Sequence, residues 1–356
     1  MNSSGIAQLL LDQGRQVATA GDGPRALVSL AAARSETSMG AISKWVEASR
    51  SEPVFHVAAQ SLEARLLAVL HYLPLAAKSA EDDTEHVHQL RVWTRRATAA
   101  IRLYRDLVPW SRAVRLRDDL SRLRRAAGEA RDYDVLAERL EKDASDPGAA
   151  KLLTRVRALR AQAQQPLLDI FDRLDHGDKF ERRLKKFVKK VRQRARTDKL
   201  HSTPFGRWAR TAIRGYVDQF LLDGQADFSS LEALHQFRIS GKKLRYTMEL
   251  LAAAFPPRFR RQLYGRVESL QDRLGRINDL ATAQARYAHW LNEAADPAEI
   301  AYLQQQAASE REELEQTRQE FLAWWTAARN KRLADSFDRL ILRRKHRGEI
   351  TDRLSG

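Results

Sequence analysis

The chain has 356 residues, of which 43% are apolar, so it can bury a core in one large or two ordinary domains, and this composition excludes a disordered protein. It has no cysteine, which excludes a disulfide scaffold and thiolate metal sites and fits a reducing compartment. The 62 Lys and Arg residues outnumber the 46 Asp and Glu residues and give a formal net charge of +16, so we expect an acidic partner.

Strong helix formers such as Ala, Leu, Arg, Gln and Glu dominate the chain, and the alternation typical of strands is missing. We therefore predict an all-α protein. Residues 1–52 contain two weak amphipathic stretches and are expected to form an N-terminal extension to which the sequence assigns no function. No stretch approaches the roughly 20 apolar residues of a membrane span, and the N-terminus has no basic signal region, so we expect a cytoplasmic protein.

Gly and Pro residues divide the rest of the chain into predicted helices. A first set belongs to residues 53–200 and comprises helices at 55–77, 84–107, 110–127, 132–144 and 149–198, the last kinked at Pro166 and interrupted near His176 and Gly177. A second set belongs to residues 201–330 and comprises helices at 204–222, 229–254, 257–274, 279–293 and 297–330. Residues 331–356 are expected to form a basic C-terminal tail.

Two glycines are expected to end helices. Gly128 follows the predicted helix 110–127, which suits a C-cap, and Asp132 could then cap the next helix. Gly275 and Asp279 stand in the same relation in the second set. Within the helices, apolar residues recur at 3–4 spacing, with Trp93 and Phe237 assigned to the core.

The two sets form an internal repeat. His88, Arg91, Arg95 and Gly128 recur 147 residues later as His235, Arg238, Lys242 and Gly275. Pro109 and Pro256, and Asp132 and Asp279, keep the same offset without a gap. Since the basic residues stand at i, i+3 and i+7, each set carries one narrow cationic stripe along a helix, with the apolar residues behind it.

These residues carry a resemblance to a known family. The pattern His88-x-x-Arg-x-x-x-Arg-Arg, followed by Gly128-Glu-Ala-Arg-Asp-x-Asp-Val-Leu, and its second copy resemble the CHAD domain, the conserved histidine α-helical domain. The resemblance covers about 53–330. It implies two pseudo-symmetric four-helix bundles, joined by long helices, around a central basic channel that binds inorganic polyphosphate. Two departures are Asn278, where the first copy has Arg131, and Gly241, whose place in the basic helix would let a ligand chain approach closely.

Polyphosphate offers only charged oxygens for recognition, so its binder needs a series of Arg and Lys donors. The residues expected to line the site are His88, Arg91, Arg95, Arg96, Arg131, His235, Arg238, Lys242, Lys243 and Arg245. A second tier comprises Arg102, Arg105, Arg124, Lys186 and Lys190, the last two from the basic run 182–190. Asp132 and Asp279 are interpreted as caps or as carboxylates that orient the basic side chains.

Each assignment has a plainer alternative. Cationic stripes are often ordinary solvated helix faces, and His88 and His235 could simply pack near the start of a helix. The sequence shows no P-loop, no Gly-rich nucleotide loop and no Ser/His/Asp arrangement, and His86 and His88 point too far apart on a helix to share one metal ion. We therefore expect no catalytic residue, no cofactor and no metal.

The leading function is polyphosphate binding, with recruitment to cytoplasmic polyphosphate granules. The first alternative is a nucleic-acid-binding protein, because any basic cleft attracts nucleic acid nonspecifically; few exposed aromatics among the basic residues count against single-strand stacking, so nucleic acid is expected as a weak competitor. A less favoured alternative is an enzyme acting on phosphate polymers, with His88 and His235 as phosphoryl acceptors.

Overall fold

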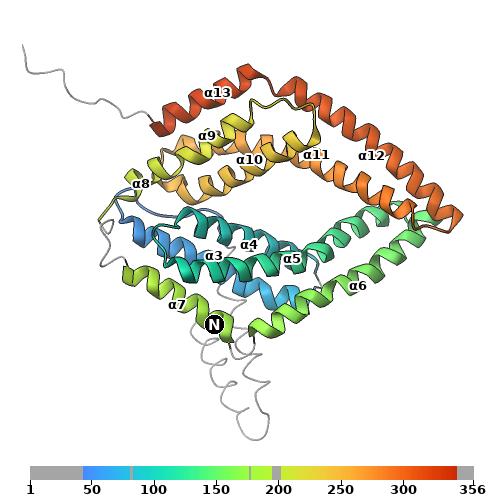
Figure 1. Cartoon of the computed structure of the whole chain (residues 1–356), viewed down its shortest axis with the longest axis horizontal. Coiled ribbons are helices and arrows are strands. Elements are labelled where there is room, and N and C mark those ends of the chain that lie inside the picture. Colours follow the sequence, from blue (N-terminus) through green and yellow to red (C-terminus); the bar gives the residue numbers. More distant parts are fainter. Residues whose placement is uncertain (1–42, 81–82, 176–177, 195–201, 343–356) are drawn as a thin grey trace, which may run out of the picture. The chain divides into compact units, whose positions relative to one another are not determined.

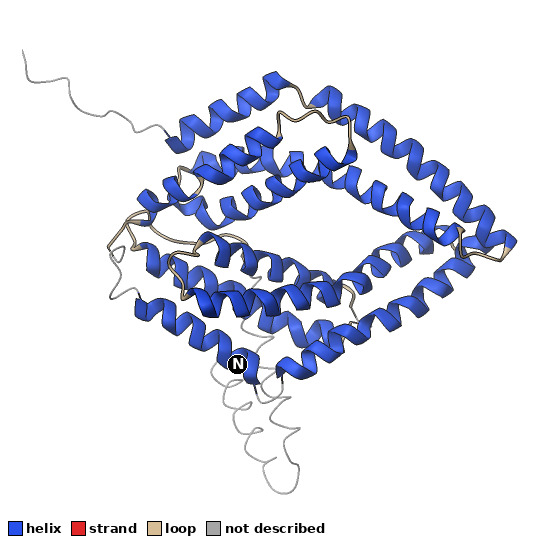
Figure 2. Ribbon diagram, in the orientation of Figure 1, coloured by secondary structure: helices blue, strands red, loops and turns tan. Residues whose placement is uncertain are grey.

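The computed structural model describes residues 43–80, 83–175, 178–194 and 202–342. Within these ranges the chain is helical and forms no β-strand, so the all-α prediction is confirmed (Figure 2). The predicted extension 1–52 and tail 331–356 lie mostly outside these ranges. Lys44 to Glu52 belong to the same compact unit as the rest of the described chain, and residues 331–337 are the end of a helix.

We call the described residues 44–194 the first half of the chain and residues 202–342 the second half (Figure 1). The helices of the first half are α3 (Val54–Lys78), α4 (Glu85–Leu103), α5 (Trp110–Leu140), α6 (Pro147–Asp175) and α7 (Lys179–Arg194). Those of the second half are α8 (Phe205–Ala212), α9 (Arg214–Asp223), α10 (Leu231–Leu251), α11 (Tyr264–Leu291), α12 (Pro297–Trp324) and α13 (Ala327–Phe337).

The helices α4 and α10 each bury the apolar side that their spacing predicts. On α4, Leu90, Ala97 and Ile101 are fully buried and Trp93 is nearly so. On α10 the fully buried side chains include that of Phe237, which stacks on Phe228 with 5.4 Å between the ring centroids. Trp93 and Phe237 are thus core residues as predicted, and each helix turns its cationic stripe away from its own core.

The prediction that Gly128 and Gly275 end helices is wrong, because α5 and α11 run through both glycines without a break. A glycine inside a helix costs only about 1 kcal/mol relative to alanine, and neither helix has a proline here to stop it. Gly128 has a different use. A Cβ at this position would lie 3.1 Å from an Arg91 guanidinium nitrogen, so the glycine lets Arg91 rest on α5 and donate to the Ala127 carbonyl at 3.0 Å.

The long helix predicted at the end of each set is divided in two. The predicted helix 149–198 consists of α6 and α7, and α6 continues through Pro166. His176 and Gly177, where an interruption was expected, lie outside the described residues. The predicted helix 297–330 ends as α12 at Trp324, and Thr326 then caps α13 by accepting a hydrogen bond from the Arg329 amide at 3.2 Å.

The two halves share an apolar cluster. It joins α5 and α6 of the first half to α11 and α12 of the second through buried residues that include Leu140, Val156, Tyr287, Trp290 and Leu303. A second contact between the halves lies where α4 approaches α10, and there Arg96 forms an ion pair with Glu249. Contacts at two separate places fix α4 relative to α10, which carry the two cationic stripes.

Candidate anion-binding site

The cationic stripes of α4 and α10 have the same local structure. Each arginine that follows the histidine by three residues is partly buried, with 16% of the side chain exposed for both Arg91 and Arg238. Arg91 lies 3.8 Å from Asp132 on α5, and Arg238 lies 3.7 Å from Asp279 on α11. Both carboxylates therefore orient arginines, as one of the two interpretations of the sequence held, and neither caps a helix.

The two histidines have different surroundings. Burial lowers the pKa of His88, and the guanidinium groups of Arg131, Arg95 and Arg91 lower it further against the opposing effect of Glu85. His235 is exposed, and its Nδ1 lies 2.9 Å from the Asn278 side-chain oxygen. Asn278 stands where the first half has Arg131, so this departure exchanges a repelling cation for a hydrogen-bond partner.

The structure brings the two stripes into electrostatic contact. Burial lowers the pKa of Lys242 on α10 to about 7, together with the positive charges of Arg238 and of Arg95 on α4. Arg95 also lowers the pKa of Arg238, after the larger effect of burial. A cation of the first half is therefore close enough to two cations of the second half to act on their charge, although the stripes are 147 residues apart in sequence.

Two members of the second tier join this group. Burial lowers the pKa of Arg124 on α5, and the neighbouring Arg95 and Arg102 lower it further. Burial likewise lowers the pKa of Arg102, followed by the effect of Arg117. We call the combined set the α4–α10 cationic face. It consists of His88, Arg91, Arg95, Arg102, Arg124, Arg131, His235, Arg238 and Lys242.

Other predicted residues are placed elsewhere. Arg96 donates through Nε to Glu249 at 3.0 Å, and Arg245 lies 3.6 Å from the same carboxylate, whose side chain is only 1% exposed. Arg96 and Arg245 thus share one buried carboxylate, and Arg245 also lies 3.8 Å from Glu268. Lys243 is exposed, and Arg105 pairs with its neighbour Asp106 at 3.6 Å.

The second-tier lysines Lys186 and Lys190 lie on α7 and are exposed. The helix α7 contacts α5 through an ion pair between Arg183 and Asp119. Asp119 lies five residues before Arg124, so at about 100° per residue it points to the far side of α5 from the cationic face. The structure therefore does not bring these two lysines together with the stripes.

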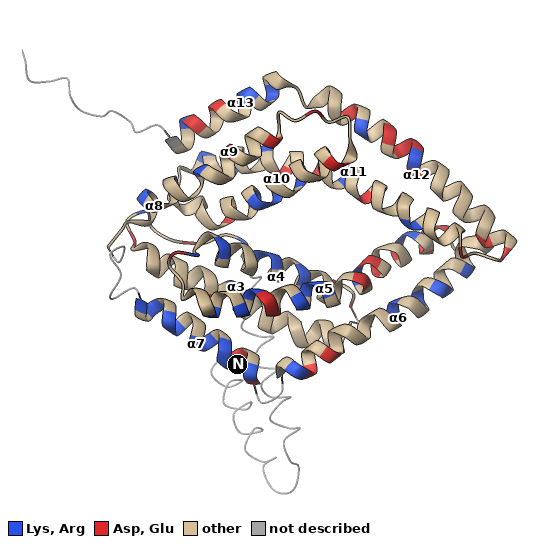
Figure 3. Ribbon diagram, viewed as in Figure 1, with Lys and Arg blue, Asp and Glu red and all other residues tan. Residues whose placement is uncertain are grey.

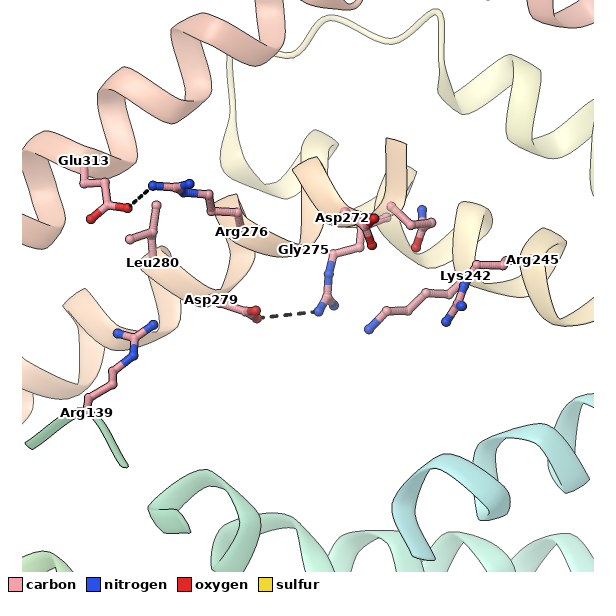
Figure 4. A pocket seen from close by; sticks show the side chains of 11 residues that line it. Arg139, Lys242, Arg245, Asp272, Gly275, Arg276, Asp279, Leu280 and Glu313 are labelled. Atoms are coloured by element: carbon pink, nitrogen blue, oxygen red, sulfur yellow. Dashed lines mark hydrogen bonds and ion pairs between the residues drawn. The ribbon is translucent and has the colours of Figure 1, made fainter. Parts of the chain in front are cut away.

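A cavity of about 590 Å³ opens beside the stripe of the second half (Figure 4). Lys242 and Asp279 line it, and Arg139 reaches it from the first half. The lining residues that the sequence did not single out include Arg139, Arg276 and Gln271. Arg276 is neutralised by Glu313 at 2.6 Å and Arg139 by Glu310 at 2.9 Å, so Lys242 and Arg238 are the cations through which this cavity joins the face.

The sequence suggested that Gly241 lets a ligand chain approach closely, but the structure gives this glycine another role. A Cβ at Gly241 would lie 2.0 Å from the amide nitrogen of Gln271, so the glycine makes room for that buried side chain. Gln271 stands 147 residues after Arg124. The repeat itself could have revealed this pair, because Thr94 and Arg124 of the first half are exchanged together for Gly241 and Gln271.

Comparison with known proteins shows the family of the chain. The family model described as the CHAD domain matches residues 60–288. The chain belongs to the CHAD domain family. A crystal structure of the CHAD domain from the plant Ricinus communis is similar over 80% of this chain and 98% of its own, with 20% sequence identity and a TM-score of 0.62. PptA from Streptomyces chartreusis is similar over 77% of this chain and 99% of its own, with 19% identity and a TM-score of 0.51. No curated protein sequence matches.

Polyphosphate binding is the kind of function known for CHAD domains, and this chain carries the histidine motif of the family in both halves. Within the described ranges, no group of three or more His, Asp and Glu side chains is arranged to hold a metal ion. None of the described helices is long and apolar enough to cross a membrane.

Proposed function

We propose that this CHAD protein binds inorganic polyphosphate on the α4–α10 cationic face and does so without chemical turnover. The observation that supports this proposal is the contact of α4 with α10, which brings the partly buried cations Arg95, Arg238 and Lys242 of both halves near enough to act on one another's charge. Like charges that are held together and partly buried repel one another, and an anion that lies between them removes that repulsion. A chain with a charge on every unit suits a face with cations from two helices.

The carboxylates of this face favour binding over catalysis. Asp132 and Asp279 are each engaged with an arginine, and both lie where they set the direction of a guanidinium group. The side chain in hydrogen-bond contact with Nδ1 of His235 is the Asn278 amide, which cannot act as a base. We propose that the histidines contact phosphate or orient its arginine ligands, and that the protein is recruited to polyphosphate granules in the cytoplasm.

A test of this function is competition between long-chain polyphosphate and single-stranded DNA for the purified chain at about 0.15 M salt. We expect polyphosphate to displace DNA, because the members of the face offer guanidinium groups and none of them is Phe, Tyr or Trp. By analogy with single-stranded nucleic acid, each neutralised phosphate should add roughly 0.7 to the slope of log K against log salt. A flat salt response, or tighter binding of DNA than of polyphosphate, would refute the proposal and favour the nucleic-acid-binding alternative.

A further inference from the structure

The helix α7 carries a cationic surface that the proposed function does not use. Its apolar residues Phe180, Leu184, Phe187, Val188 and Val191 are all buried. The exposed charged residues on the other side are basic apart from the half-exposed Glu181 in the first turn, and Figure 3 shows the blue of Lys and Arg along most of the helix, alternating with tan. A surface helix that only needed to be soluble would mix both signs of charge.

Part of this charge is neutralised and part is not. Arg183 pairs with Asp119 on α5, Arg192 with Glu63 on α3, and Lys185 with Glu181 on α7 itself. In the described part of the chain, no hydrogen bond or ion pair involves the side chains of Lys186, Lys189 or Lys190. The same is true of Lys179 at the start of the helix, and the other three unpaired lysines lie from the middle of the helix toward its C-terminal end.

The neighbouring helix α5 extends this surface. Arg115 and Arg122 are exposed on either side of Asp119, the residue that holds Arg183 of α7. They precede Arg124 by nine and two residues, so they point about 160–180° away from it around α5. One exposed carboxylate, Asp118, stands between them. We call Lys186, Lys189, Lys190, Arg115 and Arg122 the α7–α5 surface, and it faces away from the α4–α10 cationic face.

The second half of the chain provides an internal comparison. Its last helix, α13, follows α12 as α7 follows α6, and it packs on α9. The exposed charges of α13 include Lys331 and Arg332 but also Asp335. The fold therefore does not require such an excess of basic residues at this place. Lysines four residues apart, such as Lys186 and Lys190, also weaken a helix by repulsion, so the charge on α7 has a cost that a partner would remove.

We propose that the α7–α5 surface binds a second segment of polyphosphate, so that one protein molecule bridges two chains or two distant parts of one chain. This inference rests on the proposed function. The helix α7 has no exposed aromatic side chain on which nucleic-acid bases could stack. Its apolar residues are buried and therefore cannot enter a lipid bilayer. Exposed lysines act as point charges and suit a phosphate chain without a fixed register.

The test is light scattering of the full chain mixed with long-chain polyphosphate at about 0.15 M salt. Bridging predicts scattering that rises near equal charge and falls again with excess polyphosphate, when each surface holds its own chain. The variant Lys186→Gln/Lys189→Gln/Lys190→Gln should need several-fold more protein to scatter. Its affinity for a short chain of about ten phosphates, which occupies only the α4–α10 cationic face, should stay within about twofold of the parent.

The control removes the same charge from exposed residues of α12 and α13, as Arg311→Gln/Lys331→Gln/Arg332→Gln, and should scatter like the parent. Replacing the three lysines of α7 by Arg should restore bridging, and circular dichroism checks that all variants are folded. Unchanged scattering of the α7 variant, or an equal loss in the control, would overturn the inference alone. Loss of binding to duplex DNA with unchanged polyphosphate bridging would assign the surface to nucleic acid and overturn it too. A parent chain that binds neither short nor long polyphosphate would overturn the proposed function itself.

Discussion

Lys242 should make polyphosphate binding depend on pH near neutrality. Its ammonium group is partly buried between Arg238 and Arg245 on its own helix and Arg95 on α4. Asp279 on α11 opposes this effect, but it is already engaged with Arg238 at 3.7 Å. Burial and these arginines lower the pKa of Lys242 to about 7, so a large part of the free protein carries a neutral amine there at pH 7.

The sign of the effect follows from the charge of the ligand. A bound polyanion favours the ammonium form, so the pKa of Lys242 rises in the complex and binding takes up a proton. Affinity should therefore increase as the pH falls. From a free pKa of about 7, the gain between pH 8 and pH 6 is about tenfold if Lys242 stays charged in the complex, since one pKa unit corresponds to a factor of ten. Below pH 6 the gain stops, because Lys242 is charged in both states.

Calorimetric titration with short-chain polyphosphate measures this effect directly. Repeating it at pH 8 in two buffers of different ionisation enthalpy gives the number of protons taken up on binding. The conservative variant Lys242→Arg keeps the positive charge at every pH in this range and should lose both the proton uptake and the tenfold change. If the variant retains the pH dependence of the parent, the titration of Lys242 does not govern binding and the reasoning is refuted.

Three further outcomes are expected. Charge reversal of Arg91 and Arg95 should weaken polyphosphate binding by more than tenfold, and so should charge reversal of Arg238 and Lys242, because one ligand contacts both halves. A titration that shows half the stoichiometry with unchanged affinity would contradict a shared site. Replacing His88 by Gln should reduce the gain in affinity in mild acid, because the pKa of free His88 lies below its ordinary value and a bound polyanion raises it, so binding takes up a proton there; titrations of the variant and the parent over a pH series check this. Glu249→Gln should lower the free energy of unfolding by about 3 kcal/mol in urea denaturation at pH 7, because it leaves Arg96 without its buried partner.

Much of the local structure could be predicted from the sequence because it depends on spacing alone. The apolar residues of α4 and α10 recur every three or four positions, which selects a helix and the side that it buries. The orientation of Arg91 by Asp132 was also within reach, since the repeat places an aspartate at the same offset from both arginines. Where one helix ends was less predictable. Gly128 resembles a cap in sequence, and only the position of Arg91 across from it explains why a glycine stands inside α5.

Contacts between the halves could not be predicted, because they depend on how distant helices meet. Arg96 belongs to the basic motif by sequence, yet Glu249, 153 residues later, neutralises it. In the sequence Lys186 and Lys190 belong to one long basic region. Only the packing of α7 on α3 and α5 shows that they lie away from the α4–α10 cationic face. Charge in the sequence thus predicted that an anion binds, while tertiary packing determines which cations are free to bind it.

The repeat also explains why a titratable group lies in the second half. Arg95 and Lys242 occupy equivalent positions 147 residues apart, and Lys242 is partly buried among Arg238, Arg245 and Arg95. A guanidinium group keeps its charge under such repulsion because its ordinary pKa is far above neutrality, whereas an ammonium group starts lower and reaches the neutral range. The same crowded arrangement therefore yields a permanent cation from arginine and a pH-dependent one from lysine.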